Sequence, residues 1–383
     1  MRNRGVYFPG LNGIRGIAAM IVLIFHIDQY TRQYLDLEDI GIWRTEMQKF
    51  AVVMFFVLSG FLITFLLLKE KHSSGKISFQ NFYIRRILRI WPVYYLVLFV
   101  GMLLLMAFRD EVYALPKDNN MVATFLFYFF LLSNVGFALR YRADLIGNLW
   151  SIGVEEQFYA VWPLVISKVN RVFRFLVFLW VGYLVLKFVL IYVLPLPIEF
   201  EAHFEFIPFD HLMVGAIAAC LYYENSRVLK FIYHPVVQIG LWAFLLVSVF
   251  VSPVKIPILG IYNYTIHAIV YALIILNVAT NPKTLITLEN AFFNFIGRIS
   301  YGIYAFHGIV FFLVSLALNQ VYPDIENRII KLIILYVSVI GTTLVVAQLS
   351  FIYYESYFLR MKDRFAKVPT NVTRIFHNII FRH

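Results

Sequence analysis

The chain is 383 residues long, with 61% hydrophobic and 14% charged residues and a mean hydropathy of +0.76. Soluble globular chains are roughly half apolar and a quarter charged, so this composition predicts a polytopic membrane protein with no room for a second, soluble domain. The net charge of +11 could suggest a nucleic-acid partner, but basic loops facing the cytoplasm account for it better, and no nucleic acid is expected. The single cysteine, Cys220, excludes an intramolecular disulfide and a cysteine-rich metal site.

Eleven apolar segments follow one another along the chain. Each is expected to be a helix, because a bilayer admits only helices and closed barrels and these segments are too long for barrel strands. They lie at 12–30, 49–69, 84–108, 121–139, 150–168, 172–194, 208–224, 232–252, 258–280, 294–319 and 328–354. The first contains Arg15 and has no small-residue cleavage site behind it, so it is expected to remain as a spanning helix.

The charges of the connections predict the side on which each lies, because cytoplasmic loops are enriched in lysine and arginine. The connections expected in the cytoplasm are the N-terminus, 70–89, 140–142, 168–174, 227–230 and 360–367. The acidic connections, expected outside, are 31–48, 199–205 and 324–326. Basic connections therefore flank 150–168 at both ends, so both ends are expected in the cytoplasm. One segment is then expected not to carry the chain across the membrane.

The segment 150–168 is the best candidate, because it carries Glu155 and Glu156. Carboxylates in a membrane segment face a protein interior or a water-filled cavity, and such a segment could be re-entrant. The sequence thus predicts an all-α bundle of ten spans, with eleven as the alternative and both termini in the cytoplasm. The membrane domain is expected over 1–367 and a short basic tail over 368–383.

Two ionisable residues bracket the apolar run of the first segment, "IRGIAAMIVLIFH". Arg15 and His26 are eleven residues apart, so at 100° per residue they share one helix face, with about 16 Å between them along the axis. Arginine suits phosphate or carboxylate, and histidine can take up a proton near neutral pH. Alternatively, Arg15 only reaches to the headgroups and His26 only satisfies a neighbour.

Three arginines open the third segment, "NFYIRRILRIWPVYY". Arg86 and Arg89 are three residues apart and share a face, and with Arg85 they could hold an anion such as a nucleotide phosphate. The alternative is a plain anchor of the cytoplasmic side.

The remaining candidates are acidic residues and a histidine placed in apolar surroundings. Glu155 or Glu156 in "LWSIGVEEQFY" could orient the imidazole of His26 and raise its basicity, or form a structural ion pair. Asp210 in "FDHLMVG" could be only an N-cap. His307 in "ISYGIYAFH" could be only a satisfied core residue.

Together these motifs resemble the integral-membrane acyltransferases of the acyltransferase-3 type, whose members O-acylate sugars of lipopolysaccharide, exopolysaccharide, Nod factor and peptidoglycan, or small molecules. The arginine, ten residues, then histidine of the first segment is the family's hallmark, carried here by Arg15 and His26. The matching stretches are "LNGIRGIAAMIVLIFH", "FFVLSGFLIT", "FYIRRILRIWPVYY", "LWSIGVEEQFY", "FDHLMVG", "IGRISYGIYAFH" and "YYESYFLRMKDRF".

The resemblance implies transfer of an acyl group across the cell inner membrane, with acetyl-CoA as the expected cytoplasmic donor and no metal. The donor phosphates would lie on Arg86 and Arg89, and also on Arg15. The acceptor, a hydroxyl of a sugar or glycan, would arrive from the outer side, with Asp210 and His307 on the acceptor site.

His26 would act either as general base or as a transient acyl carrier. General base catalysis is preferred, because one histidine with a carboxylate partner, Glu155 or Glu156, suffices for one-step transfer. The competing function is a proton-coupled secondary transporter, since intramembrane arginine, histidine and glutamate also serve proton relays. No two-fold internal repeat, which many carriers show, is visible in the sequence.

Overall fold

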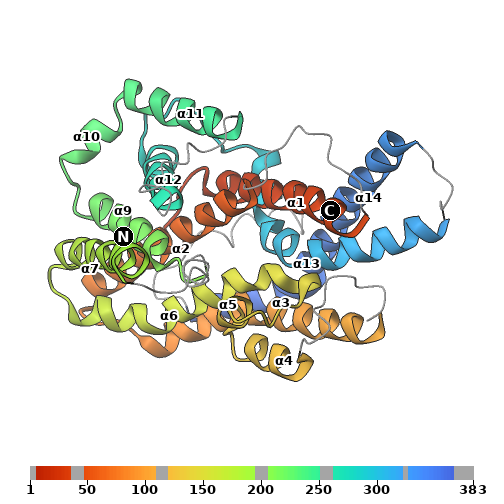
Figure 1. Ribbon diagram of the computed structural model, residues 1–383. Helices are drawn as coiled ribbons and strands as arrows, with labels where there is room; N and C mark the ends of the chain where they lie inside the picture. Colours follow the sequence, from red (N-terminus) through yellow and green to blue (C-terminus); the bar gives the residue numbers. More distant parts are fainter. Residues whose placement is uncertain are drawn as a thin grey trace, which may run out of the picture.

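The computed structural model describes residues 6–35, 47–108, 120–194, 206–250, 262–321 and 327–365, and every element within them is helical (Figure 1). The all-α prediction is therefore confirmed. The first half contains α1 (Leu11–Leu35), α2 (Met47–Ser74), α3 (Phe79–Ala107), α4 (Met121–Phe129), α5 (Ser133–Ala138), η1 (Asp144–Leu149), α6 (Trp150–Lys168), α7 (Val172–Phe188) and η2 (Val189–Val193). The second half contains α9 (Phe209–Tyr223), α10 (Val228–Ile232), α11 (Pro235–Phe250), α12 (Asn263–Thr280), α13 (Ala291–Val321), α14 (Arg328–Ser350), η4 (Phe351–Glu355) and α15 (Ser356–Asp363).

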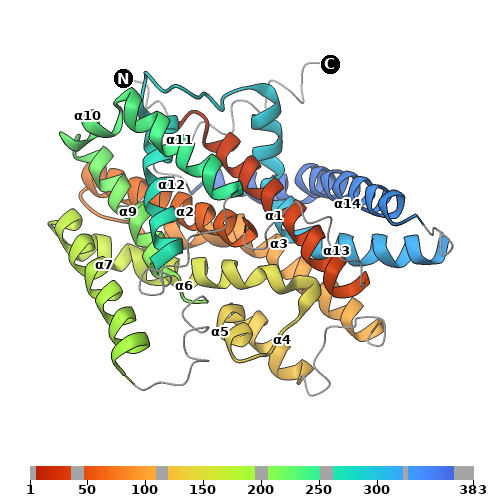
Figure 2. The same cartoon turned by 45° about the horizontal axis from the view of Figure 1, so that its top comes forward.

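Among the described residues, seven helices are long and apolar enough to cross a membrane, and the helices Phe209–Tyr223 and Pro235–Ser248 are shorter but apolar. This confirms a polytopic membrane bundle. In the stretches Val172–Val193 and Arg328–Lys362, only 6% and 22% of the most apolar 18-residue window is buried. Figures 1 and 2 both place α7 and α14 at the edges of the bundle. Their apolar side chains are therefore available to lipid. The tail 368–383 and the acidic connections 199–205 and 324–326 lie outside the described residues, as does most of 31–48.

The segment 150–168 forms one continuous helix, α6, which is not among the seven described helices that are long and apolar enough to cross a membrane. The phenol of Tyr83, near the start of α3, donates to the carbonyl of Ala160 at 2.7 Å, whereas Ile146 packs against Gly101 near the other end of α3. Tyr83 and Gly101 are about 27 Å apart along a helix axis at 1.5 Å per residue, which is most of a hydrocarbon core of about 30 Å. The stretch from η1 through α6 therefore runs antiparallel to α3 along most of its length. That 150–168 does not carry the chain across stays a prediction.

The segment 121–139, predicted as one helix, forms two. It divides into α4 and α5 (Figure 2) because Leu131 adopts a left-handed backbone with φ of 60°, and Arg140 does so again with φ of 68°. A non-glycine residue in this region interrupts a helix. The aromatic ring of Tyr141 stacks on Phe127, which holds the returning chain beside α4.

Helices α1 and α13 are parallel, and their close contact determines the position of the candidate site. The amide of Asn12 donates to Asn294 at 3.1 Å, Gly16 faces the backbone of Gly297, and His26 meets His307 at 2.9 Å. A Cβ atom added at Gly297 would lie 2.1 Å from the carbonyl oxygen of Asn12. Small residues allow membrane helices to approach this closely.

We predict that Gly297→Ala lowers thermal stability in detergent, because the new methyl group forces α13 away from α1. Overpacking of this kind costs about 1–3 kcal/mol. Gly341→Ala in α14 is the matched control, since an added Cβ there meets nothing within 4 Å, and its melting temperature should not fall. Equal melting temperatures for the two variants would contradict the packing described.

Candidate active site

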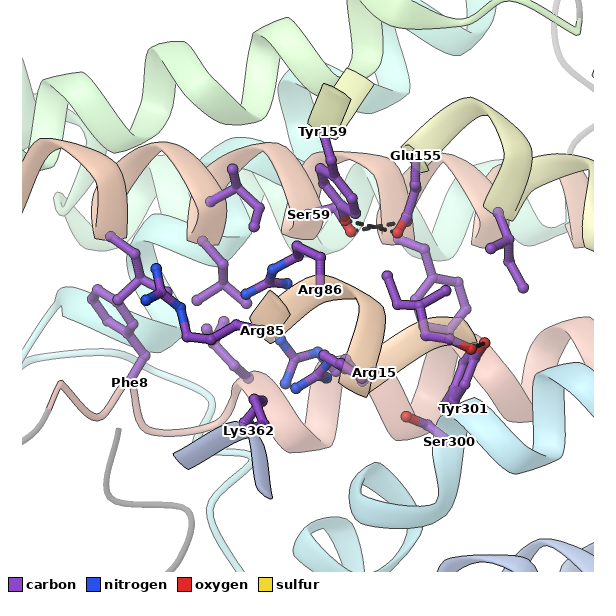
Figure 3. A pocket seen from close by; sticks show the side chains of 18 of the residues that line it. Phe8, Arg15, Ser59, Arg85, Arg86, Glu155, Tyr159, Ser300, Tyr301 and Lys362 are labelled. Carbon is purple, nitrogen blue, oxygen red and sulfur yellow. Dashed lines mark hydrogen bonds between the residues drawn. The ribbon is translucent and has the colours of Figure 1, made fainter. Parts of the chain in front are cut away.

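A cationic cavity of about 250 Å³ lies between α1, α2, α3, α6 and α13. Five cationic side chains and two carboxylates line it: Arg15, Arg85, Arg86, Arg89, Lys362, Glu70 and Glu155. Figure 3 shows the guanidinium groups of Arg15, Arg85 and Arg86 directed into one shared space, with Lys362 beside them. The structure thus brings together the three predicted phosphate-binding arginines, Arg15, Arg86 and Arg89, and the lining carries an excess of three positive charges when all seven groups are ionised.

The arginines of this cavity differ in how far the protein already satisfies them. Arg85 is paired with Glu70 at 3.3 Å and donates to the carbonyl of Phe365 at 2.8 Å. Arg86 lies over the rings of Phe82 and Tyr159, and its Nε is buried with no hydrogen-bond partner among the described residues. A buried, unsatisfied guanidinium donor is costly unless an acceptor reaches it. Arg86 thus keeps hydrogen-bonding capacity that the described residues do not use.

The two glutamates of α6 are held differently. Glu155 lies at the end of the cationic cavity away from Arg85 (Figure 3), where its carboxylate accepts hydrogen bonds from Ser59 and Tyr159, each at 2.8 Å. Glu156 accepts from the indole of Trp91 at 2.9 Å. Glu156 is not among the residues that line the cationic cavity or the cavity around His26.

A second cavity, of about 260 Å³, contains His26 and Asp210, two of the predicted site residues. Its lining combines aromatic and polar side chains: Gln29, Gln48, Lys49, Phe56, Phe137, Trp150, Lys187, Phe206, His211, Tyr264 and Tyr304. Arg15 and His26 thus open into two different cavities, although they share one face of α1.

His26 is paired with His307, and the expectation of a glutamate partner was wrong. Nδ1 of His26 lies 2.9 Å from Nε2 of His307, and the two ring planes differ by only 8°. Glu155 and Glu156 make their bonds elsewhere, and neither lines the cavity of His26. The reason is the orientation of α6, whose glutamates point toward α2 and α3.

The backbone of α13 fixes the tautomer of this histidine pair. Nδ1 of His307 lies 2.7 Å from the carbonyl of Tyr304 and 3.2 Å from that of Ile303. A carbonyl only accepts, so this Nδ1 carries the proton, and the Nε2 of neutral His307 is an acceptor. His26 must then donate from Nδ1, which leaves the lone pair of its Nε2 available as a base. His307 was predicted to bind substrate; the structure places it 2.9 Å from His26, and it does not line either of the two cavities.

Asp210 is not an N-cap. Helix α9 begins at Phe209, and no side chain caps it. The buried carboxylate of Asp210 accepts from the hydroxyl of Thr265 at 2.5 Å and lies 3.5 Å from Nε2 of His211. The bond from Thr265 ties α9 to α12 at the second cavity.

The sequence matches the acyltransferase-3 family, an acyltransferase domain, over residues 8–351. The chain belongs to the acyltransferase-3 family. It is 31% identical to O-acetyltransferase OatA of Staphylococcus aureus (strain NCTC 8325 / PS 47) over 170 residues, 44% of this chain and 26% of that protein. It is 25% identical over 372 residues to a protein of strain COL named "Putative O-acetyltransferase SACOL0978", which covers 92% of this chain and 57% of that protein. The chain thus spans less than two thirds of these relatives. No solved structure matches it significantly.

Several residues of the candidate site could not be predicted from the sequence. Ser59 and Tyr159 bind Glu155, and Tyr304 lines both cavities. Serine and tyrosine are common in any membrane helix, so their type alone gave no signal. The spacing of Tyr159 from Glu155, four residues on one helix, was the one local clue, since such residues are neighbours on a helix face.

Proposed function

We propose that this chain is a membrane O-acyltransferase that moves an acyl group, with acetyl expected, from acyl-CoA to a hydroxyl group of a sugar or glycan. The observation that carries the proposal is the pairing of His26 with His307. This pairing leaves Nε2 of His26 free to act as a base, and His26 lines the second cavity. The cationic cavity, on the other side of Tyr304, suits the phosphates of the donor.

The donor would bind in the cationic cavity. Arginine pairs with phosphate through charge-assisted hydrogen bonds, and Arg15, Arg86 and Arg89 face the same space. Acyl-CoA is made in the cytoplasm, and the basic connections of the chain favour the cytoplasm for the end of the bundle that carries Arg85. Both termini would then be cytoplasmic, and the protein would lie in the cell inner membrane.

In the transfer, Nε2 of His26 would remove the proton of the acceptor hydroxyl while the hydroxyl oxygen attacks the thioester carbonyl. The carbon–sulfur bond then breaks, and the thiolate takes the proton from His26 and leaves as the free thiol of CoA. His307 would stabilise the imidazolium that forms in between, because its Nε2 accepts from Nδ1 of His26. This is general base catalysis with an oriented imidazole.

The acceptor would enter the second cavity. Aromatic faces beside amide and charged groups suit a sugar ring with its hydroxyls, and Trp150, Phe206 and Gln29 line the cavity together with Asp210. The resemblance to sugar-modifying relatives supports a glycan at this place. A transporter function is not favoured, because the chain belongs to an acyltransferase family.

We predict that a deletion strain loses one acyl mass from its glycan, seen by mass spectrometry, and that wild-type protein restores it. The variant His26→Ala should insert into the membrane in normal amounts but restore nothing, because the general base is lost. General base catalysis contributes about 10²–10⁴-fold. Restoration of the wild-type acyl content by His26→Ala would refute the mechanism.

For His307 we predict a graded response. His307→Ala should lower transfer strongly, because the tautomer of His26 is no longer fixed and a buried N–H loses its acceptor. His307→Gln, whose amide oxygen can accept from Nδ1 of His26, should recover part of the activity. The check is kcat at saturating acceptor with KM for the donor measured beside it. A fall in kcat that Gln does not relieve would contradict the orienting role.

For the donor site we predict that Arg86→Ala weakens CoA binding about tenfold or more, since a charge-assisted phosphate contact contributes about 1.5–3 kcal/mol. Arg174→Ala is the control, because Arg174 is an exposed cation that does not line the cavity. Calorimetric titration of the purified protein with CoA gives both dissociation constants. Equal values for the two variants would remove Arg86 from the donor site.

A further inference from the structure

Tyr304 is the single residue, among those described, that lines both the cationic cavity and the cavity of His26. Its neighbours divide between the two sides. Phe55 and Ser151 line the cationic cavity, whereas Phe56 and Trp150, the residues beside them in the chain, line the other. The two cavities therefore meet at Tyr304, a residue that is only 6% exposed.

The ring is held by its hydroxyl group. Oη of Tyr304 lies 2.6 Å from the hydroxyl of Ser151 and donates to the carbonyl of Asn148 at 2.9 Å. The edge of the ring contacts Phe55, with 5.6 Å between centroids. Both hydrogen-bonding partners of the phenol are neutral, and bonds between neutral groups are the weaker kind. The side chain can thus be released without separating an ion pair.

The backbone of the same residue is held separately. The carbonyl of Tyr304 accepts from the amide of Asn148 and from Nδ1 of His307. The ring of Tyr304 also meets the ring of His307 edge-on, with 6.0 Å between centroids. Release of the phenol breaks this ring contact but no hydrogen bond of the histidine pair.

Resting on the proposed function, we propose that Tyr304 is a movable partition between the donor and acceptor cavities. With the ring in place, water from the acceptor side cannot reach a thioester in the donor cavity. When the ring turns, the acyl group can reach the acceptor hydroxyl beside His26. The size of the opening then sets the length of acyl chain that passes, so Tyr304 is a specificity-determining residue for short acyl groups.

Side-specific labelling tests the partition without any acyl donor or acceptor. Cys220 is replaced by serine and Leu62, which lines the cationic cavity only, by cysteine. Sealed membrane vesicles of both orientations are treated with an impermeant, anionic methanethiosulfonate reagent. With Tyr304 intact, the new cysteine should react only from the face that carries Arg85. With Tyr304→Ala it should react from both faces.

Two further variants serve as controls for this test. Gln29→Cys, on the acceptor cavity, shows that the reagent enters from the far face. Tyr301→Ala removes an equally large side chain that lines the cationic cavity but not the other, and Leu62→Cys should remain one-sided in it. Labelling of Leu62→Cys from both faces with Tyr304 intact would overturn the partition. The partition would also be overturned if, in Tyr304→Ala, Leu62→Cys reacted from one face only although Gln29→Cys reacts from the far face.

Tyr304→Phe keeps the ring and loses both hydrogen bonds of the phenol. This variant can test the proposal if Tyr304→Ala does not fold. It should raise the rate of CoA release from acetyl-CoA without acceptor by about tenfold, since about 1.4 kcal/mol of lost hydrogen bonding shifts a closed-to-open equilibrium by that factor. It should also raise the butyryl-to-acetyl transfer ratio. Unchanged values of both would overturn the proposal. Failure of wild-type protein to transfer acyl groups at all would instead refute the proposed function, while the labelling result would stand.

Discussion

The close parallel packing of α1 on α13 is the constraint on which the rest of the site depends. Gly16 and Gly297 let the two backbones touch, and a membrane offers no hydrophobic force that would hold looser helices in register. Because the two helices run in the same direction, the contact between Asn12 and Asn294 also sets which residues face each other further along, including His26 and His307. The register that aligns the histidines is therefore set roughly 20 Å away, at 1.5 Å per residue.

The same two helices separate two kinds of chemistry along the membrane normal. Arg15 faces the cationic cavity and His26 the other, and α13 supplies Tyr304 between them. A single cavity with both would place a neutral imidazole beside several guanidinium groups, whose charges would oppose its protonation. Arg15 is about 16 Å from His26 along the axis of α1, and Tyr304 lies between the two cavities. The spacing seen in the sequence thus places the two residues in different cavities, although they share a helix face.

The sequence predicted what local periodicity and hydropathy determine. The helices, the shared face of Arg15 and His26, and the clustering of Arg86 with Arg89 all follow from spacing within one segment. The partner of His26 could not be predicted in this way, because His307 is 281 residues away and the pairing depends on tertiary register. Which neighbours Glu155 contacts depends on how α6 is rotated about its axis. Hydrophobic periodicity does not determine this rotation, because α6 is apolar on most of its faces. The left-handed Leu131 that breaks 121–139 carries no local signal, since leucine is a strong helix former.

The position of Glu155 follows from the charge of the cavity it lines. Several guanidinium groups in one cavity within a membrane repel one another strongly, because the surroundings screen charge poorly. Glu155 offsets part of this repulsion, and Ser59 and Tyr159 hold its carboxylate at the end away from Arg85. Glu70 offsets a further part through Arg85. Two carboxylates against five cations still leave the cavity positive, so an anion gains from the remaining field while the bundle tolerates the charges. A glutamate that serves this balance must stay near the arginines, and that is why the imidazole of His26 is oriented by a second histidine and a backbone carbonyl instead.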